Sequence, residues 1–166
     1  MKAVQGRGAN LFGAAACLAM LAFALYSEKV LGLAPCPLCM FQRVGVLALG
    51  IVFLAAALHN PGRMGGRAYA VLIVVAAGST LAVAARHVNV QSLPPGPVTA
   101  SGASLAILLE VFPHLEVVRK VMTGGGECAQ VDWRFLGLSM PAWVLVAAGL
   151  LGVYGAAANS ERRTPR

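Results

Sequence analysis

Two cysteines, Cys36 and Cys39, form the pattern in this sequence that most directly implies chemistry. Pro37 and Leu38 separate them, and Arg43 follows one helical turn after Cys39. A CxxC spacing, a nearby cation and a helix N-terminus all favour the thiolate. The thiolate is the species that attacks disulfides. The pattern therefore predicts thiol–disulfide redox chemistry in which Cys36 and Cys39 are catalytic and Arg43 assists.

Two other interpretations of this cysteine pair are a structural disulfide and half of a metal site. A disulfide that spans two intervening residues closes a very small loop and stabilises little. A structural zinc ion needs four ligands. The possible ligands that the topology predicted below places on one side of a membrane are Cys36, Cys39, Cys128, His87 and His114. No second CxxC and no HxxxH accompanies them. We therefore predict no metal ligands.

Arg43 and His87 each have a functional and an ordinary interpretation. Arg43 is either an interfacial arginine whose charged end reaches water or a cation that stabilises the anionic forms of a quinone during reduction. His87 is either a polar residue that ends a helix or a hydrogen-bond partner for a quinone head group. Position alone leaves both pairs of interpretations open, and the neighbouring cysteines favour the functional interpretation of Arg43.

The elements that must position these residues are membrane-spanning helices. The chain has 166 residues, of which 58% are hydrophobic and 11% charged, and its mean hydropathy is +0.76. Soluble domains carry roughly 25% charged residues. Four uncharged apolar runs predict an all-α membrane protein, a four-transmembrane-helix bundle in one domain, 1–166, and the expected spans are 9–27, 41–58, 68–86 and 141–158.

Charge sets the expected orientation of this bundle. The N-terminus, the loop between the second and third spans and the C-terminal tail carry seven Lys or Arg residues and one Glu, whereas the other side carries six and five acidic residues. By the positive-inside rule, both termini are cytoplasmic and loops 28–40 and 87–140 face outward. The basic excess is therefore a topology signal, and nucleic acid is not an expected partner.

Two further features complete the expected architecture. Segment 104–122 is apolar but contains several ionisable residues, so we expect a short interfacial helix in the long loop, or a helix packed on the bundle, rather than a fifth span. Cys17 lies well inside the first span, too deep to reach a loop thiol, and is expected to be a small buried hydrophobe.

With these features in place, the chain resembles the DsbB family, the inner-membrane proteins that re-oxidise the periplasmic oxidant DsbA and pass electrons to quinone. The resemblance covers nearly the whole chain. It is carried by Cys36–Cys39 with Phe41-Gln42-Arg43, by His87, and by Gly126–Ala129 running into Trp133–Trp143. The last block is the most specific of these, because CxxC alone is common.

The resemblance implies a function and a site. It implies a membrane oxidoreductase of the bacterial inner membrane with periplasmic redox loops, which oxidises a DsbA-like thioredoxin-fold partner and reduces ubiquinone or menaquinone from the membrane quinone pool. Cys36 and Cys39 would be the quinone-coupled pair, Arg43 and His87 would bind the quinone, and Cys128 would belong to a second, loop pair.

The sequence departs from the family pattern at Ser101. This residue stands where the resemblance places the first loop cysteine, which takes the mixed disulfide with DsbA, and a serine hydroxyl cannot enter thiol–disulfide exchange. Normal turnover is therefore expected to be blocked in this sequence, although Cys128 could still pair with Cys36.

Two alternative functions remain at this stage. One is another quinone-coupled redox fold, similar to vitamin K epoxide reductase, which also combines about four helices with CxxC. The other is a non-catalytic membrane scaffold or metal-binding protein. The block after Cys128 favours the DsbB family over the first, and metal analysis with thiol counting would separate the second.

Overall fold

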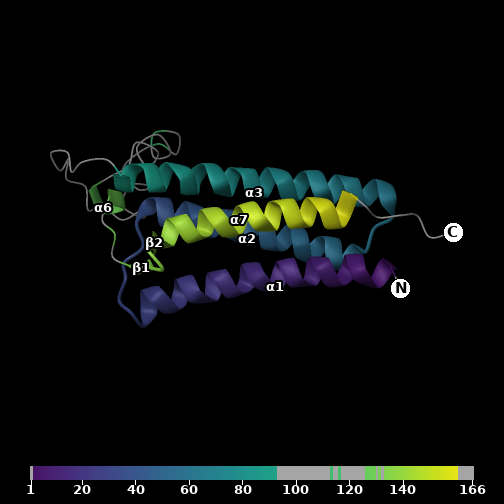
Figure 1. The fold of residues 1–166 in the computed structure, drawn as a ribbon, viewed down its shortest axis with the longest axis horizontal. Coiled ribbons are helices and arrows are strands. Elements are labelled where there is room, and N and C mark those ends of the chain that lie inside the picture. Colours follow the sequence, from purple (N-terminus) through teal and green to yellow (C-terminus); the bar gives the residue numbers. More distant parts are fainter. Residues whose placement is uncertain are drawn as a thin grey trace.

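Four long helices run side by side and make up most of the molecule (Figure 1). The structure is a computed structural model that describes residues 2–92, 113, 116, 126–129, 131 and 133–160. The long helices are α1 (Lys2–Lys29), α2 (Pro37–His59), α3 (Arg63–Ser92) and α7 (Met140–Ser160). They confirm the predicted all-α four-helix fold.

Each of these helices is long and apolar enough to cross a membrane. Large apolar side chains cover their outer surfaces, for example Leu18 with 69% and Val153 with 74% of the side chain exposed. Such a surface is unfavourable in water. It is suited to the hydrocarbon core of a membrane, because apolar side chains need none of the hydrogen-bond partners that this core lacks. The chain is therefore a multi-pass membrane protein.

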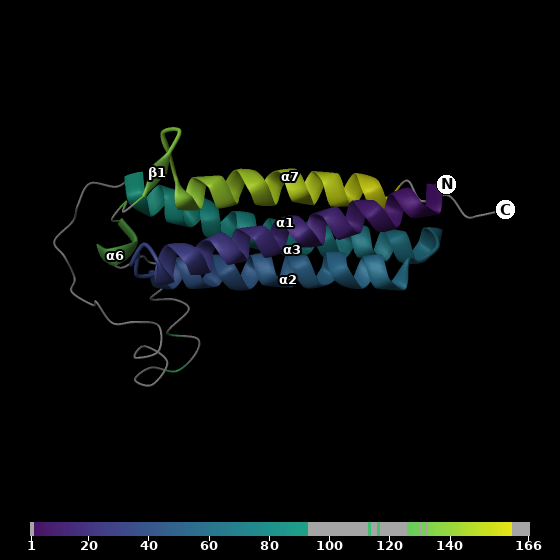
Figure 2. The same ribbon diagram turned by 90° about the horizontal axis from the view of Figure 1, so that it is seen from below.

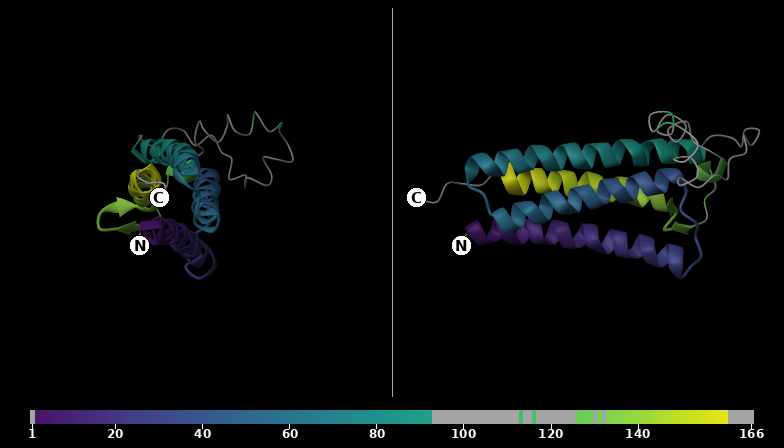
Figure 3. Two further views of the ribbon diagram at one scale, coloured as in Figure 1. Left: turned by 90° about the vertical axis from the view of Figure 1, so that its right-hand side faces the viewer. Right: turned by 180° about the vertical axis from the view of Figure 1, so that it is seen from behind.

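The helices pack as a bundle in which α3 lies mainly on α7, α1 lies mainly on α2, and α2 joins the two pairs through α3 (Figure 3). The core is centred on Phe53, which is fully buried. Gly13 of α1 and Gly155 of α7 both face this ring, which leaves room for it between three helices. Cys17 is 1% exposed in the same cluster, so its prediction as a buried hydrophobe is confirmed.

The two ends of the bundle differ in structure. The start of α1 and the end of α7 lie at one end, where Asn10 and Asn159, both fully buried, exchange two amide hydrogen bonds of 3.0 and 2.8 Å. The short helix α6 (Gly126–Ala129) and the hairpin of β1 (Arg134–Phe135) and β2 (Leu138–Ser139) lie at the opposite end (Figures 1 and 2).

The hairpin between α6 and α7 was not predicted. Arg134 pairs with Ser139 and Phe135 with Leu138 in antiparallel register. The turn residues Leu136 and Gly137 both have positive φ, 51° and 81°, as the tight turns of two-residue hairpin loops require. Trp143 donates an indole hydrogen bond of 3.0 Å to the carbonyl of Phe135, which ties the hairpin to α7.

Several helices extend beyond the predicted spans, and two of these differences lie near the cysteines. Helix α2 begins at Pro37, ahead of the predicted span 41–58, because Cys36 caps it and proline is favourable in the first turn. Helix α3 continues to Ser92, so His87 lies within the helix and does not begin the outer loop. Ser101 lies outside the described residues, and so does nearly all of segment 104–122, for which an interfacial helix was predicted.

Candidate functional site

Cys36 forms the N-terminal cap of α2. Its backbone is extended, with φ −71° and ψ 163°, and Pro37 follows in the first turn. The backbone N–H of Cys39 donates to Sγ of Cys36 over 3.4 Å. A Ser or Asp oxygen usually accepts this capping bond. The fold therefore places the sulfur of Cys36 at the N-terminal end of α2, next to Cys39.

The sulfur of Cys36 lies at the centre of a cluster of reactive side chains. It is 3.2 Å from Sγ of Cys39 and 3.7 Å from Nε2 of His87. The sulfurs of Cys36 and Cys128 and a ring nitrogen of His87 all lie within 4.8 Å of one another. All three cysteines are free thiols in this structure. Cys36 can therefore exchange with two other sulfurs, one on its own helix and one on α6.

Cys128 is the most deeply buried thiol of this cluster, with 1% of its side chain exposed. Its hydrogen bond to Cys36 raises the pKa of the Cys128 thiol well above the ordinary value, and burial raises this pKa further. Cys128 is consequently protonated at neutral pH and donates its hydrogen to Cys36. This arrangement disfavours negative charge on Cys128.

Gln42 and His87 form a buried pair beside the cysteines. The Gln42 side-chain amide lies 3.0 Å from Nδ1 of His87, and the two side chains are 4% and 2% exposed. When the amide N–H donates to Nδ1, the ring proton is on Nε2 and faces Cys36. Amide orientation and histidine tautomer are linked in this way, so Gln42 determines which form of His87 the sulfur of Cys36 meets.

Arg43 is fixed against α1 rather than left free at the membrane surface. Its guanidinium group forms an ion pair with Glu28 and donates to the carbonyl of Ala24 over 2.9 Å. The Arg43 and Glu28 side chains are 18% and 25% exposed, so the pair is only partly accessible to water. These contacts join the start of α2 to the end of α1 and hold the charge in one place.

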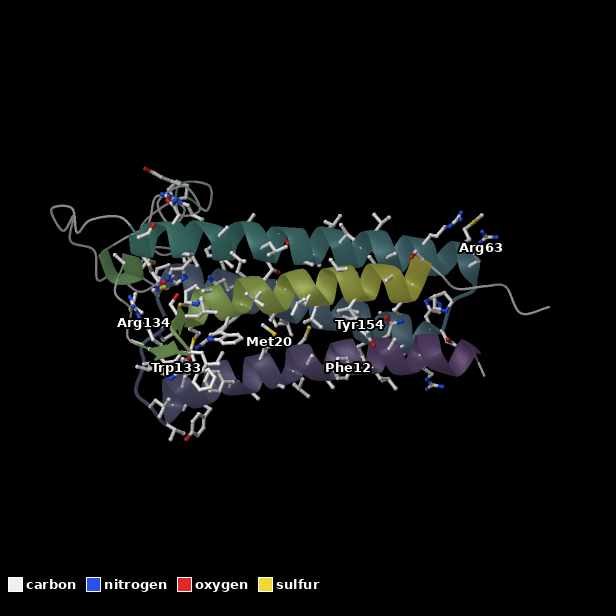
Figure 4. The ribbon with its side chains drawn as sticks, viewed as in Figure 1. Phe12, Met20, Arg63, Trp133, Arg134 and Tyr154 are labelled. Carbon is white, nitrogen blue, oxygen red and sulfur yellow. The ribbon has the colours of Figure 1, made fainter. Side chains whose placement is uncertain are left out.

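A cavity of about 230 Å³ lies beside this cluster. Its polar wall contains Cys36, Cys39, Gln42, Arg43 and His87. The apolar wall comes from α1, α7 and the segment before the hairpin, and includes Met20, Leu21, Trp133, Met140, Pro141 and Val144. Figure 4 labels Met20 and Trp133 at this part of the bundle. A largely apolar cavity with a few polar groups is typical of small-molecule sites.

Aromatic contacts hold the wall of the cavity that Trp133 forms. The ring of Trp133 stacks on Phe135 with centroids 5.9 Å apart and lies 5.5 Å from the ring of Phe23 on α1. Ser139 of the hairpin also donates a 2.7 Å hydrogen bond to the side-chain oxygen of Gln91 on α3. Trp133 and the hairpin therefore contact α1, α3 and α7 at the end of the bundle that holds the cysteines.

The structure brings together most of the residues that the sequence singled out. Cys36, Cys39, Cys128 and His87 form one cluster, and Arg43 lies with three of them on the cavity wall. Ser101, the remaining predicted site residue, cannot be placed because it lies outside the described residues.

Sequence reasoning missed Glu28 and Gln42 as parts of the site. Glu28 was counted only as a loop charge. A carboxylate near the end of one span and an arginine near the start of the next could have suggested an ion pair between the two helices. Gln42 was noted only as part of Phe41-Gln42-Arg43. Its contact with His87 joins two helices far apart in sequence, and no local pattern predicts such a contact.

The fold and this site define a multi-pass membrane protein with a cysteine cluster suited to thiol–disulfide exchange at one end of a four-helix bundle. The family profile described as "Disulfide bond formation protein DsbB" matches residues 6–158 of the chain. The chain therefore belongs to the DsbB family, which confirms the resemblance seen in the sequence.

Individual relatives agree with this assignment. A disulfide bond formation protein B of Marinobacter nauticus is 49% identical over 150 residues, which cover 90% of this chain and 89% of that protein. A protein of the same name from Xanthomonas campestris pv. campestris is 46% identical over 161 residues and covers 96% of this chain and 94% of its own. Another, from Methylococcus capsulatus, is 45% identical over 150 residues, with coverages of 90% and 92%.

Proposed function

We propose that this protein is a quinone-dependent thiol:disulfide oxidoreductase of the bacterial inner membrane. In this proposal it oxidises a periplasmic DsbA-like dithiol protein and delivers the electrons to ubiquinone or menaquinone. The observation that carries the proposal is the sulfur of Cys36, 3.2 Å from Cys39 and next to Cys128, at a cavity whose wall also holds Arg43 and His87. Membership of the DsbB family favours it over an enzyme similar to vitamin K epoxide reductase.

The proposed electron path uses Cys36 as the sulfur shared by two disulfides. With a cysteine at position 101, the loop disulfide would join that cysteine to Cys128. A reduced partner would reduce this disulfide and would itself become oxidised. A loop thiolate would then attack Sγ of Cys36, which breaks the Cys36–Cys39 bond and releases Cys39 as a thiolate. When the loop disulfide re-forms, two electrons and two protons have passed to Cys36 and Cys39.

The cavity supplies the second half of the proposed reaction. A quinone bound there accepts two electrons and two protons while the Cys36–Cys39 disulfide re-forms. Arg43, held by Glu28 and by the carbonyl of Ala24, would stabilise negative charge on a quinone oxygen. His87, positioned by Gln42, would donate a hydrogen bond or a proton at the same site.

The proposed orientation places the cysteine end of the bundle in the periplasm and both ends of the chain in the cytoplasm. It is supported by the excess of Lys and Arg near the start of α1, in the first turns of α3 and in the C-terminal tail. This places the cysteine cluster in an oxidising compartment, where disulfides persist.

The decisive experiment restores the missing thiol. The Ser101→Cys variant, purified in detergent, should oxidise a DsbA-like dithiol protein in a reaction that requires added quinone. The unaltered chain and a matched Ser101→Ala variant should show little turnover, because a hydroxyl or methyl group cannot form the mixed disulfide. If Ser101→Cys is folded but shows no quinone-dependent oxidation of the dithiol, the proposed function is wrong.

A further inference from the structure

Three side chains of the types that bind metal ions converge from separate segments of the chain. Cys36 lies at the start of α2, His87 in α3 and Cys128 on α6. All three are buried, and their sulfur and nitrogen atoms lie within 4.8 Å of one another. No pair of these residues has the close spacing of a metal-binding motif, and for this reason the sequence predicted no metal site.

One distance in this cluster matches the separation of two ligands around a tetrahedral zinc ion, and the other ligand atoms lie within 4.8 Å. Zn–S bonds of about 2.3 Å and Zn–N bonds of about 2.0–2.1 Å place sulfur and nitrogen ligands about 3.6 Å apart at tetrahedral angles. The observed separation of Cys36 Sγ and His87 Nε2 is 3.7 Å. An ion could therefore bind between these ligands with small movements of the side chains.

The surroundings of His87 also suit a metal ligand. A ligating histidine usually donates its other ring N–H to a fixed acceptor, which orients the ring. Gln42 lies 3.0 Å from Nδ1 of His87. The amide nitrogen of Gln42 faces the ring in this structure, and a half-turn of the amide group would bring its oxygen to the same place, where it would accept Nδ1–H and leave the lone pair of Nε2 directed at the cluster. Cys36 and His87 also line the cavity, which offers an ion a route to the site.

From these observations, we propose that the reduced protein binds one Zn²⁺ ion, or a similar soft divalent cation, through Cys36, His87 and Cys128. Two thiolates and one neutral imidazole suit zinc, and three protein ligands leave a fourth position for water or for another thiol. Binding displaces the two thiol protons and involves no change of oxidation state.

Metal binding of this kind would hold the protein in its reduced form. Both sulfurs needed for exchange between the loop and the CxxC pair would be coordinated, so neither could attack or form a disulfide. A zinc ion would act as a reversible inhibitor that binds only after the cysteines have been reduced. The binding itself needs only the three reduced side chains and is independent of the proposed quinone reaction.

The test is a metal titration of the full-length protein, purified in detergent, reduced and freed of metal. Zn²⁺ is added in competition with a chromophoric chelator. A parallel titration uses Co²⁺, whose absorption spectrum reports tetrahedral thiolate coordination. We expect one ion per chain. Cys128→Ser and His87→Ala should each weaken the affinity at least tenfold, and Gln42→Leu should weaken it by about 10- to 100-fold, as for other partners of metal-bound histidines.

Two controls protect this test against misfolding and against unrelated sites. Cys17→Ser removes a thiol that lies in the core away from the cluster, so it should leave the affinity unchanged. Oxidation of the unaltered chain should abolish binding without any substitution. The proposal is overturned if the reduced protein binds no stoichiometric ion, or if Cys128→Ser binds zinc as tightly as the unaltered chain. Neither readout depends on quinone activity, so this proposal and the proposed function can fail separately.

Discussion

At the scale of single residues, the roles of the three clustered cysteines follow from their environments rather than from their spacing. Cys36 accepts the backbone N–H of Cys39 and donates to Sγ of Cys39, whereas Cys128 is buried and donates to Cys36. This environment disfavours the thiolate of Cys128. The same contrast defines a test of the geometry.

Cys128 should be alkylated slowly at neutral pH, and its rate should keep rising at high pH. Its pKa is raised, so the reactive thiolate forms only above the ordinary cysteine pKa of about 8.5. The measurement is the alkylation rate of Cys128 against pH, followed by mass spectrometry of the reduced protein in detergent.

The Cys36→Ala variant is the comparison for that experiment. It removes the partner whose hydrogen bond raises the Cys128 pKa most, so the pH profile of Cys128 should move to lower pH. A rate that levels off near pH 8.5 in the unaltered chain would contradict the described environment.

Arg43→Ala should weaken the use of quinone far more than it weakens folding. In the Ser101→Cys background, we expect the KM for quinone to rise about tenfold or more, because hydrogen bonds to charged groups contribute about 1.5–3 kcal/mol. Arg63→Ala is the matched control, since Arg63 lies at the opposite end of the bundle (Figure 4). An unchanged KM for quinone in Arg43→Ala would exclude the proposed role.

At the scale of helices, close packing around Phe53 joins α1, α2 and α7. A Cβ atom on Gly155 would lie 2.6 Å from Cζ of Phe53, and one on Gly13 would lie 2.7 Å from the same ring. These distances are shorter than real Cβ contacts, so both glycines are required by the ring between the helices. Small residues at helix contacts are a common feature of membrane bundles.

Gly155→Ala should destabilise the bundle by about 1–3 kcal/mol, the usual cost of overpacking a core. The midpoint of thermal unfolding in detergent should fall accordingly. Gly78→Ala is the control, because nothing lies within 4 Å of a Cβ atom there and alanine is the better helix former. Equal unfolding midpoints for the two variants would contradict the described packing.

At the scale of the whole molecule, the sequence predicted the number and type of the long elements better than it predicted the site. The four apolar runs identify the four helices because hydropathy alone decides which segments enter a membrane. The start of α2 was predicted too late, because the capping role of Cys36 was not considered, and α3 was predicted too short, because His87 was expected to end the hydrophobic part.

The site was harder to predict because its contacts join distant segments. The pairing of Glu28 with Arg43 and of Gln42 with His87 depends on how neighbouring helices rotate about their axes. The position of Cys128 beside Cys36 was suggested only by resemblance to the family, and no local pattern in the sequence implies it.

The buried amide pair of Asn10 and Asn159 should contribute to stability through its hydrogen bonds. Replacing only Asn159 by Leu leaves the Asn10 amide buried without its partner, so unfolding should be easier by about 1 kcal/mol. The double variant Asn10→Leu, Asn159→Leu removes both polar groups and should recover part of this loss. If the double variant were less stable than Asn159→Leu by about a further 1 kcal/mol, the two residues would contribute to stability independently.

The same amide pair has a consequence for the biosynthesis of the protein. Asn10 belongs to α1 and Asn159 to α7, so Asn10 leaves the ribosome well before its partner. Until α7 is inserted, Asn10 lacks the partner that it has in the finished bundle, and an unpaired amide in lipid is costly. Only the insertion of α7 therefore satisfies this amide and completes the closed end of the bundle.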